Sequence, residues 1–411
     1  MIRKHIFSLG EGKIFLPLIW YGGFFIERLK AKCMKKFTSI FLIILSVSGC
    51  SNTDIAMIFH VATGWGGNGI TKAILDERIE VAQGYKIELL TENLDGPRFM
   101  RFSPDGFLLV ASPKQKSIFL IETEGRNRGA QKIVIQDLNR PHSLDFFENK
   151  IYIAEQDGIL VADWKNGEIT GSPKRIISGL TENGNHRSKT VRIGPDKHIY
   201  VSMGSTCNVC LEEDHRRGTM MRFNLDGSEP EIYAFGLRNS VGFDWAPFDG
   251  AIYATDNGRD LLGDNFPPCE LNKLERGGFY GWPFYNGDNI LDPDFGEFGS
   301  KTENTPIMPV HKFKAHNAPL GLTFLKNQSN AYQDSALVAL HGSWNKSERD
   351  GYKVVSLSWR NGKIAENDFV SGFLSEGKVI GRPVDVLESK DGSIYISDDY
   401  ADAIYRVSPS N

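Results

Sequence analysis

After residue 80 the chain repeats one pattern, in which a turn containing Gly, Asp or Asn leads into a short apolar run. The runs are Phe107–Val110, Ile151–Ala154, Ile199–Ser202, Ala251–Ala254, Ala336–Leu340 and Ile394–Ser397. The early copies are spaced by roughly 45 to 50 residues, which is the length of one four-stranded propeller blade. The pattern predicts an all-β, six-bladed β-propeller over residues 82–409. An array of β-sandwiches is the alternative, because alternating strands alone do not reveal closure.

Two segments depart from the repeat. One gap between copies is doubled, and it contains the Gly- and Pro-rich stretch 258–309. We interpret this stretch as a long functional excursion between blades, because structureless loops of such length are otherwise uncommon. Ahead of the repeat, residues 50–81 are expected to form a linker, in which residues 70–81 have the pattern of one short amphipathic helix.

The start of the chain has the pattern of a targeting signal. Two lysines after Met34 are followed by the apolar run 37–47 and then by Ser48-Gly49-Cys50. The run is too short to span the ~30 Å hydrocarbon core of a bilayer. We therefore expect residues 34–49 to be a lipoprotein signal peptide and residues 1–33 to be a mis-assigned extension. Cys50 would carry the lipid, and the exported protein would face the periplasm, with the outer membrane favoured, or the cell exterior.

Composition narrows the class of protein. The 411 residues include 42 glycines, 11% aromatic and 24% charged residues, which suits a turn-rich globular protein rather than a disordered or multi-span one. The formal charge of -4 gives no basic excess, so nucleic acid is not an expected partner. The pair Cys207 and Cys210 admits a local disulfide, half of a metal site or a redox motif. An oxidising compartment and the lack of a second such pair favour the disulfide.

Several polar groups adjoin predicted strands. His186 accepts a proton near neutral pH, and Arg238 offers a permanent charge for a carboxylate or a developing oxyanion. The alternatives are a hydrogen-bonded structural histidine and a salt bridge between blades. The loop that holds Asp264 and Asn265 is rich in the oxygen ligands that calcium requires, although acidic loops are also commonly just solvated. Polar clusters around His316 and in 340–346 are typical of the mouth of a cofactor site.

Five motifs then occur in a characteristic order. They are His186-x-Ser188 with Ile193-Gly194-Pro195-Asp196, Gly236-Leu237-Arg238-Asn239, Glu270-Leu271-Asn272 with Gly278-Phe279-Tyr280-Gly281-Trp282-Pro283, Ala318-Pro319-Leu320-Gly321, and His341-Gly342-Ser343-Trp344-Asn345. In this order they resemble the soluble quinoprotein glucose/sorbosone dehydrogenases, and the resemblance covers roughly residues 85–408. It implies oxidation of an aldose or related sugar by hydride transfer to pyrroloquinoline quinone (PQQ), assisted by calcium.

The resemblance also implies a role for particular residues. His186 would be the catalytic base, and Arg238 would steady charge on the quinone oxygen. The implied cofactor-binding residues are Arg238, Asn239, His316, Asn345, Lys346 and Arg382, with Lys346 favoured over Asn345 for a cofactor carboxylate. The implied calcium ligands are Asp264 and Asn265, through backbone carbonyls of their loop, at the cofactor and Glu270 and Tyr280 at a second, structural ion. The Cys207/Cys210 pair also resembles the sorbosone-like branch.

Two positions depart from the glucose enzymes of that family. They have an aspartate beside the catalytic histidine, near the place where this chain has Ser205, and a second arginine where it has Val384. Two other classes of function stay open: a calcium-dependent lactonase-like hydrolase and a non-catalytic surface-binding propeller. The sequence names neither the sugar nor the electron acceptor.

Overall fold

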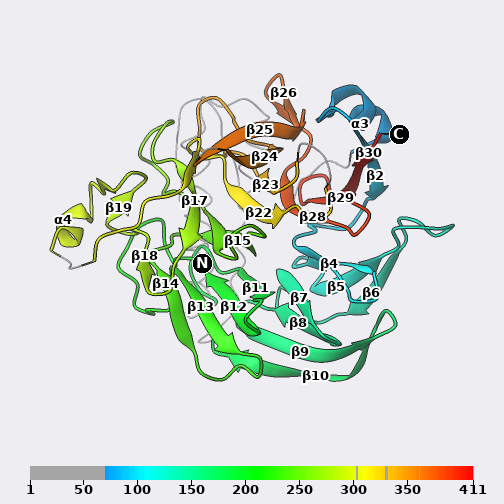
Figure 1. The fold of residues 1–411 in the computed structure, drawn as a ribbon, viewed down its shortest axis with the longest axis horizontal. Helices are drawn as coiled ribbons and strands as arrows, with labels where there is room; N and C mark the ends of the chain where they lie inside the picture. The colour runs from blue at the N-terminus through cyan, green and yellow to red at the C-terminus, as the bar shows by residue number, and fades with distance from the viewer. Residues whose placement is uncertain (1–69, 302–303, 329–331, 361, 411) are drawn as a thin grey trace, which may run out of the picture. The chain divides into compact units, whose positions relative to one another are not determined.

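The computed structural model describes residues 70–301, 304–328, 332–360 and 362–410. Within these residues, six sheets with four antiparallel strands at the core of each surround a common centre (Figure 1). The prediction of an all-β, six-bladed propeller is confirmed. The predicted signal peptide, the lipid-bearing Cys50 and the extension 1–33 lie outside the described residues. No helix in the described part of the chain is long and apolar enough to cross a membrane.

The strands of each blade are given from the innermost outward. The first blade consists of β3 (Met100–Phe102), β4 (Leu108–Ser112), β5 (Ser117–Ile121) and β6 (Gln131–Ile135), and the second of β7 (Ser143–Phe147), β8 (Lys150–Ala154), β9 (Gly158–Lys165) and β10 (Glu168–Ser178). The third consists of β11 (Lys189–Ile193), β12 (His198–Met203), β13 (Thr219–Asn224) and β14 (Glu231–Phe235). The fourth blade consists of β15 (Ser240–Trp245), β16 (Ile252–Asp256), β17 (Cys269–Leu274) and β21 (His311–Phe313). The fifth consists of β22 (Pro319–Phe324), β23 (Ser335–Leu340), β24 (Lys353–Arg360) and β25 (Lys363–Ser371), and the sixth of β28 (Pro383–Glu388), β29 (Ile394–Asp398), β30 (Ala403–Pro409) and β2 (Tyr85–Thr91).

The repeated apolar run of the sequence marks the same strand in every blade. It falls on the second strand, which is β4, β8, β12, β16, β23 or β29. This strand is flanked by the first and third strands of its own sheet and covered by the neighbouring blades, so its residues are almost all buried. The burial explains why the runs contain more apolar residues than a half-exposed strand would.

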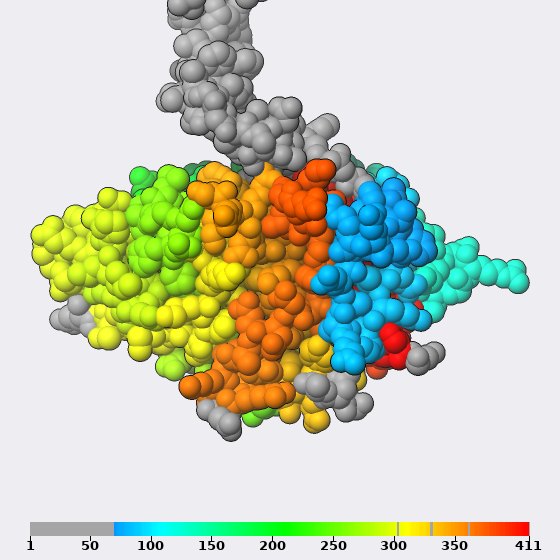
Figure 2. Space-filling model, turned by 90° about the horizontal axis from the view of Figure 1, so that it is seen from above, coloured from blue at the N-terminus to red at the C-terminus, as the bar shows by residue number. Residues whose placement is uncertain are grey.

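The last blade is closed by the two ends of the described chain. The early strand β2 pairs antiparallel with β30, with Tyr85 opposite Pro409 (Figure 1). The helix α3 (Lys72–Arg78) and the short strand β1 (Glu80–Val81) precede it, and β1 pairs with β25. Arg78 donates to the backbone of the hairpin formed by β26 (Leu374–Ser375) and β27 (Lys378–Val379). Figure 2 shows this early segment, in blue, beside the orange-red segment that contains the hairpin.

Charged side chains on the innermost strands join neighbouring blades around the central channel. Asp145, Asp244 and Asp385 each accept a backbone N–H from the innermost strand of the next blade, at 2.7, 2.9 and 2.8 Å. Arg192 lies between two of these carboxylates, 3.4 Å from Asp145 and 3.0 Å from Asp244. Since buried charges are stable only when paired and hydrogen-bonded, this ring holds the blades in register. The apolar core lies between adjacent blades, as in the cluster shared by β8 and β12.

The Gly- and Pro-rich stretch proves to lie within a blade, so the expectation of an excursion between blades was wrong. Residues 257–268 connect β16 to β17, and residues 275–310 connect β17 to β21. The second connection contains β18 (Gly278–Phe279), the hairpin of β19 (Tyr285–Asn286) and β20 (Ile290–Leu291), and α4 (Gly296–Gly299). Strand β18 pairs in parallel with β14 of the preceding blade. The insertion therefore supports a neighbouring blade, a link that local sequence does not reveal.

Candidate active site

A cavity of about 510 Å³ opens where two kinds of loop meet at one end of the propeller. One kind connects each blade to the next, and the other connects the second and third strands within a blade. Of the predicted site residues, the cavity is lined by His186, Arg238, Asn239, His316, Asn345 and Arg382. The structure thus brings together one residue set that spans about 200 positions of the chain.

Each connection between blades contributes at least one basic side chain to the cavity, and one from each recurs at a matching position. In chain order these are Arg98, His142, His186, Arg238, His316 and Arg382. Each lies one to three residues before the innermost strand of its blade. Arg98 and His142 are not in the motifs of the sequence analysis. The sequence could have revealed them, because an Arg or His recurs at this position in all six copies of the blade. The propeller brings the six together because these connections lie at the same end of the ring.

His186 precedes β11 and is held by the loop that follows β12. Its Nδ1 lies 2.9 Å from the hydroxyl of Ser205, and its backbone N–H donates to the Ser205 carbonyl at 3.2 Å. Burial and the nearby Arg238 charge lower the pKa of His186 to about 3, although Asp260 acts in the opposite direction. The ring is therefore neutral at physiological pH in the protein without ligand, which is the form that accepts a proton.

Arg238 uses all five of its N–H groups within the protein. They reach Asn208 O and Oδ1 at 2.9 and 2.8 Å, Asn257 O at 3.1 Å, Gly258 O at 2.9 Å and Asp260 Oδ2 at 2.9 Å. Asp256 accepts the backbone N–H of both Arg238 and Asn239, at 2.9 and 2.6 Å. The guanidinium therefore presents a fixed charge to the cavity rather than a free donor.

Asp260 connects Arg238 to two more predicted residues. It accepts from Asn345 Nδ2 at 2.9 Å and lies 3.8 Å from His316 Nδ1, and its charge raises the pKa of His316. Lys346 does not line the cavity, because its ammonium lies 3.5 Å from Asp350. The structure thus places Asn345, which we had ranked second to Lys346, at the cavity wall.

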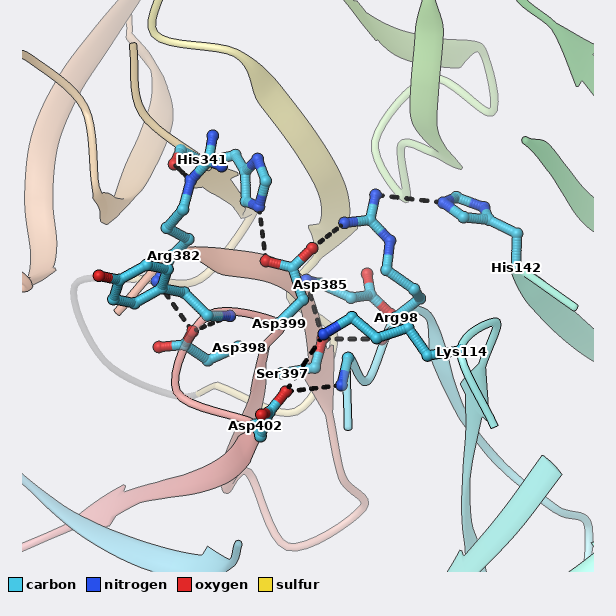
Figure 3. Close-up of polar contacts among 12 residues, drawn as sticks. Arg98, Lys114, His142, His341, Arg382, Asp385, Ser397, Asp398, Asp399 and Asp402 are labelled. Atoms are coloured by element: carbon cyan, nitrogen blue, oxygen red, sulfur yellow. Dashed lines mark hydrogen bonds and ion pairs between the residues drawn. The ribbon is translucent and has the colours of Figure 1, made fainter. Parts of the chain in front are cut away.

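The opposite wall holds a second polar network (Figure 3). His341 Nε2 lies 2.8 Å from Asp399, which pairs with Arg98 at 2.6 Å, and Arg98 in turn donates to His142 at 3.2 Å. Arg382 donates to the carbonyls of His341 and Gly342 at 3.0 and 3.2 Å. Nη1 of Arg382 has no hydrogen-bond partner among the described residues, so this arginine can donate to a ligand.

The predicted calcium ligands fall into two places. Glu270 and Tyr280 line a small second cavity of about 20 Å³ together with Asp256, which lies opposite Glu270 in the sheet. Burial and the Asp256 carboxylate raise the pKa of Glu270 to about 8. The hydroxyl of Tyr280 donates to Lys273 O at 2.7 Å. Asp264 and Asn265 do not line either cavity, and the side-chain carboxylate of Asp264 accepts from the backbone N–H of Ser347.

The structure contains a disulfide between Cys207 and Cys210, with Cα atoms 6.2 Å apart. Cys269 is a free, buried cysteine. Glu212 lies close to the cysteine pair and would complete a metal-like cluster. Because both sulfurs are used in the disulfide, a thiolate metal site does not form there in this state.

The lining of the main cavity is cationic although the whole chain is acidic. Six lining residues are Lys or Arg and two are Asp: Arg98, Lys114, Arg140, Arg187, Arg238 and Arg382 against Asp260 and Asp399. Asn257 and Asn345 also line it, and the Oδ1 atom of each is buried without a hydrogen-bond partner. Buried acceptors without partners are rare, so these two oxygens suit a donor or a cation from a ligand. The cavity therefore fits an anionic, metal-associated ligand.

Comparisons with known proteins agree with the resemblance found in the sequence. The chain is 33% identical over 350 residues to an uncharacterized protein of Borreliella burgdorferi, covering 80% of this chain and 90% of that protein. It is 24% identical over 406 residues to a pyrroloquinoline quinone-dependent pyranose dehydrogenase of Coprinopsis cinerea, covering 80% of this chain and 54% of that protein. It thus spans about half of the Coprinopsis protein.

A solved structure and a family match complete the comparison. The calcium structure of the Trichoderma reesei carbohydrate-active enzyme of family AA12 superposes with a TM-score of 0.69 at 19% identity, covering 81% of this chain and 97% of that one, which shows the shared fold. The TrAA12-like family matches residues 79–269 and 291–410. The chain belongs to this TrAA12-like family of six-bladed propellers, which resemble the soluble quinoprotein glucose/sorbosone dehydrogenases.

Proposed function

We propose that the protein is a PQQ- and calcium-dependent dehydrogenase that oxidises an aldose or related sugar at its aldehyde or hemiacetal carbon. The observation that carries this proposal is that His186 and Arg238 line one cation-rich cavity. A neutral imidazole and a fixed guanidinium are the base and the electrostatic partner that a hydride transfer requires. The name of the Coprinopsis relative supports the same class of reaction.

The residues of the cavity fit the cofactor. PQQ carries three carboxylates, and Arg382 has a free Nη1 group for one of them. Asn345 and His316 line the same wall, and the unpartnered Oδ1 of Asn257 is an oxygen of the kind that calcium binds. The structure of the Trichoderma relative is described as a calcium structure. We therefore assign Arg382, Asn345 and His316 to the cofactor and Asn257 to its calcium ion.

The protein's own groups account for the proton and the charge. The sugar hydroxyl gives its proton to His186, and the hydrogen on the same carbon leaves with both electrons, so that a carbonyl forms. When bound, PQQ would supply the acceptor for that hydride. The charge of Arg238 stabilises negative charge that grows nearby. Burial is the main cause of the low pKa of His186, and Arg238 is the second; the charge of an anionic ligand would act against the second of these causes.

Dye-linked kinetics test the proposal directly. Purified protein is incubated with PQQ and CaCl₂, and dye reduction is followed with a panel of aldoses, pyranoses and sorbosone. We expect turnover that needs both additions, and quinone binding visible by its absorption spectrum. Absence of both turnover and quinone binding would overturn the proposal. Calcium-dependent hydrolysis of a lactone that is insensitive to PQQ would do so in favour of a hydrolase.

The second cavity suits a separate calcium ion held by Glu270. Its volume of about 20 Å³ is enough for one ion, and Glu270 and Asp256, which are partners on neighbouring strands, both line it. We expect calcium alone to raise the melting temperature of the protein without quinone, because a ligand that binds only the folded state stabilises it. The substitution Glu270→Gln should abolish that increase, whereas Glu275→Gln, a change outside both cavities, should keep it.

We further propose that the exported protein is anchored by lipid at Cys50, facing the periplasm or the exterior. The basic pair, apolar run and Ser48-Gly49-Cys50 sequence support this proposal. Mass spectrometry of the N-terminal peptide from membranes tests it. An acylated peptide that begins at Cys50 is expected, and an unmodified peptide that retains residues 34–49 would contradict it.

A further inference from the structure

The bonds around Ser205 determine which nitrogen of His186 carries the proton. The Ser205 hydroxyl donates to the carbonyl of Cys207 at 2.7 Å, and it lies 2.9 Å from His186 Nδ1. A hydroxyl has one proton to donate, and a carbonyl can only accept. Since that proton goes to Cys207, the contact with His186 must be donated by Nδ1–H. The Nε2 atom of the neutral ring is then the unprotonated nitrogen.

The same residue also lies between the backbones of His186 and Arg238. Ser205 accepts from His186 N at 3.2 Å and donates to Arg238 O at 2.7 Å. Gly204 is packed so closely that a Cβ atom there would lie 2.6 Å from His186 Cβ and 2.7 Å from Asn239 Oδ1. Because real Cβ atoms do not approach other atoms so closely, only glycine permits this approach of the two loops.

The guanidinium of Arg238 is held by the next part of the same loop. Asn208 accepts from Nε and Nη2 of Arg238 at 2.9 and 2.8 Å. Its amide also donates to Asp260 O at 3.0 Å and accepts from Asp260 N at 2.8 Å. Asn208 therefore supplies two of the five acceptors of Arg238 and fixes the backbone of Asp260, the acid that pairs with that arginine.

The disulfide closes the part of this loop that makes these contacts. Asn208 lies between Cys207 and Cys210, and the carbonyl that orients Ser205 belongs to Cys207 itself. At the far end of the loop, Arg217 donates to the carbonyls of His186 and Ser205 at 3.1 and 3.0 Å. A short covalent ring reduces the conformations open to these groups before any ligand binds.

We propose that the segment Gly204–Cys210, whose last four residues are closed by the disulfide, positions both catalytic groups: Ser205 sets the His186 tautomer with Nε2 free for the substrate, and Asn208 holds the Arg238 guanidinium. Ser205 and Asn208 are positioning residues, because they act through His186 and Arg238. The hydroxyl–carbonyl pair thus takes the place that a carboxylate has in the glucose enzymes that this family resembles. This inference rests on the proposed function for its consequence, but the tautomer itself is a property of the protein without cofactor.

Nitrogen-15 NMR of the histidine rings tests the first part of the proposal, which is that Ser205 sets the tautomer of His186. In protein labelled at histidine, the two-bond correlations of each ring show which nitrogen bears the proton, and His186→Gln identifies the His186 signals. We expect the Nδ1–H form in the wild type at pH 7 and a mixture, or the Nε2–H form, in Ser205→Ala. Ser228→Ala, which removes a hydroxyl from the β13–β14 turn of the same blade, is the matched control. An Nε2–H form in the wild type, or no change in Ser205→Ala, would overturn the assignment.

Kinetic measurements test the second part of the proposal, which is that Asn208 and the disulfide hold Arg238. With PQQ and calcium added, Asn208→Ala and the double change Cys207→Ser with Cys210→Ser should lower kcat about 10-fold or more with a smaller change in KM, because misplacing a catalytic group weakens the transition state first. Circular dichroism checks that both variants fold, and Asn208→Asp, which keeps the side-chain acceptor that Asn208→Ala removes, should retain more activity than Asn208→Ala. Unchanged kcat in the folded double variant would contradict a positioning role. If the wild type shows no dehydrogenase activity but the predicted tautomer, the proposed function fails while the role of Ser205 stands.

Discussion

The two walls of the cavity each present a histidine, and the two are supported differently. His186 has a neutral partner, the hydroxyl of Ser205, whereas Nε2 of His341 faces the carboxylate of Asp399. A carboxylate normally favours the protonated imidazole and raises its pKa. Yet burial and neighbouring arginines lower the pKa of both histidines to about 3. The carboxylate therefore does not by itself make His341 the stronger base.

The difference between the walls lies in what else the acid binds. Asp399 pairs with Arg98 at 2.6 Å, and the Arg382 charge also acts on His341 (Figure 3). The charged groups of this wall pair with one another, and their network links the first, second, fifth and sixth blades. On the other wall, the groups that hold His186 and Arg238 are mainly backbone carbonyls and amides, which fix direction without adding charge. We therefore infer that one wall mainly stabilises the propeller and that, under the proposed function, the other carries the reaction.

The largest expected effect is on activity and comes from the first wall. His186→Asn should lower kcat by about 10³-fold, since general-base catalysis contributes about 10²–10⁴. Steady-state dye reduction with PQQ and calcium measures it. His341→Asn, the matched change on the opposite wall, should lower kcat far less. Equal losses in the two variants would remove the distinction between the walls.

The next effect is on stability and comes from the second wall. Asp399→Asn leaves Arg98 and His341 without their acid and should cost about 2–3 kcal/mol of unfolding free energy. The expected cost is below that of a fully buried pair because the side chains of Arg98 and Asp399 are 17% and 15% exposed. Urea denaturation measures it. Ser205→Ala is the comparison from the reactive wall, and a greater loss of stability there would reverse our assignment of the walls.

The smallest effect is the dependence of stability on pH. Burial lowers the pKa of His142 far below its ordinary value, followed in size by the effect of Arg98. Between the folded pKa and the unfolded value of about 6.5, the unfolded state binds more protons, so stability is lost as the pH falls. His142→Gln lacks this loss, so its stability relative to the wild type should improve by about 2 kcal/mol from pH 7 to pH 5. Urea denaturation at both pH values measures the difference, and a constant difference would contradict the prediction.

The sequence predicted the fold because the signal repeats. The second strand of each blade is buried between the neighbouring blades, so its residues form an apolar run that can be recognised in the sequence. The family resemblance predicted His186, Arg238 and Arg382, all of which line the cavity. The roles expected of Asp264 and Lys346 stay predictions, because the direction of a loop side chain depends on its partners. Here those partners are Ser347 and Asp350, and both side chains lie outside the cavity lining.

What the sequence determined by itself was thus the blade period, the family resemblance and the chemical types at the site. Only the tertiary structure decided which groups meet. Strand β2 closes the ring with β30, and Arg98 meets Asp399 at a separation of 301 residues. The replacement for the absent aspartate was likewise visible only in three dimensions, because Ser205 acts through the Cys207 carbonyl. Hydrogen bonds depend on distance and direction, and neither can be inferred from residue type when the partners come from different loops.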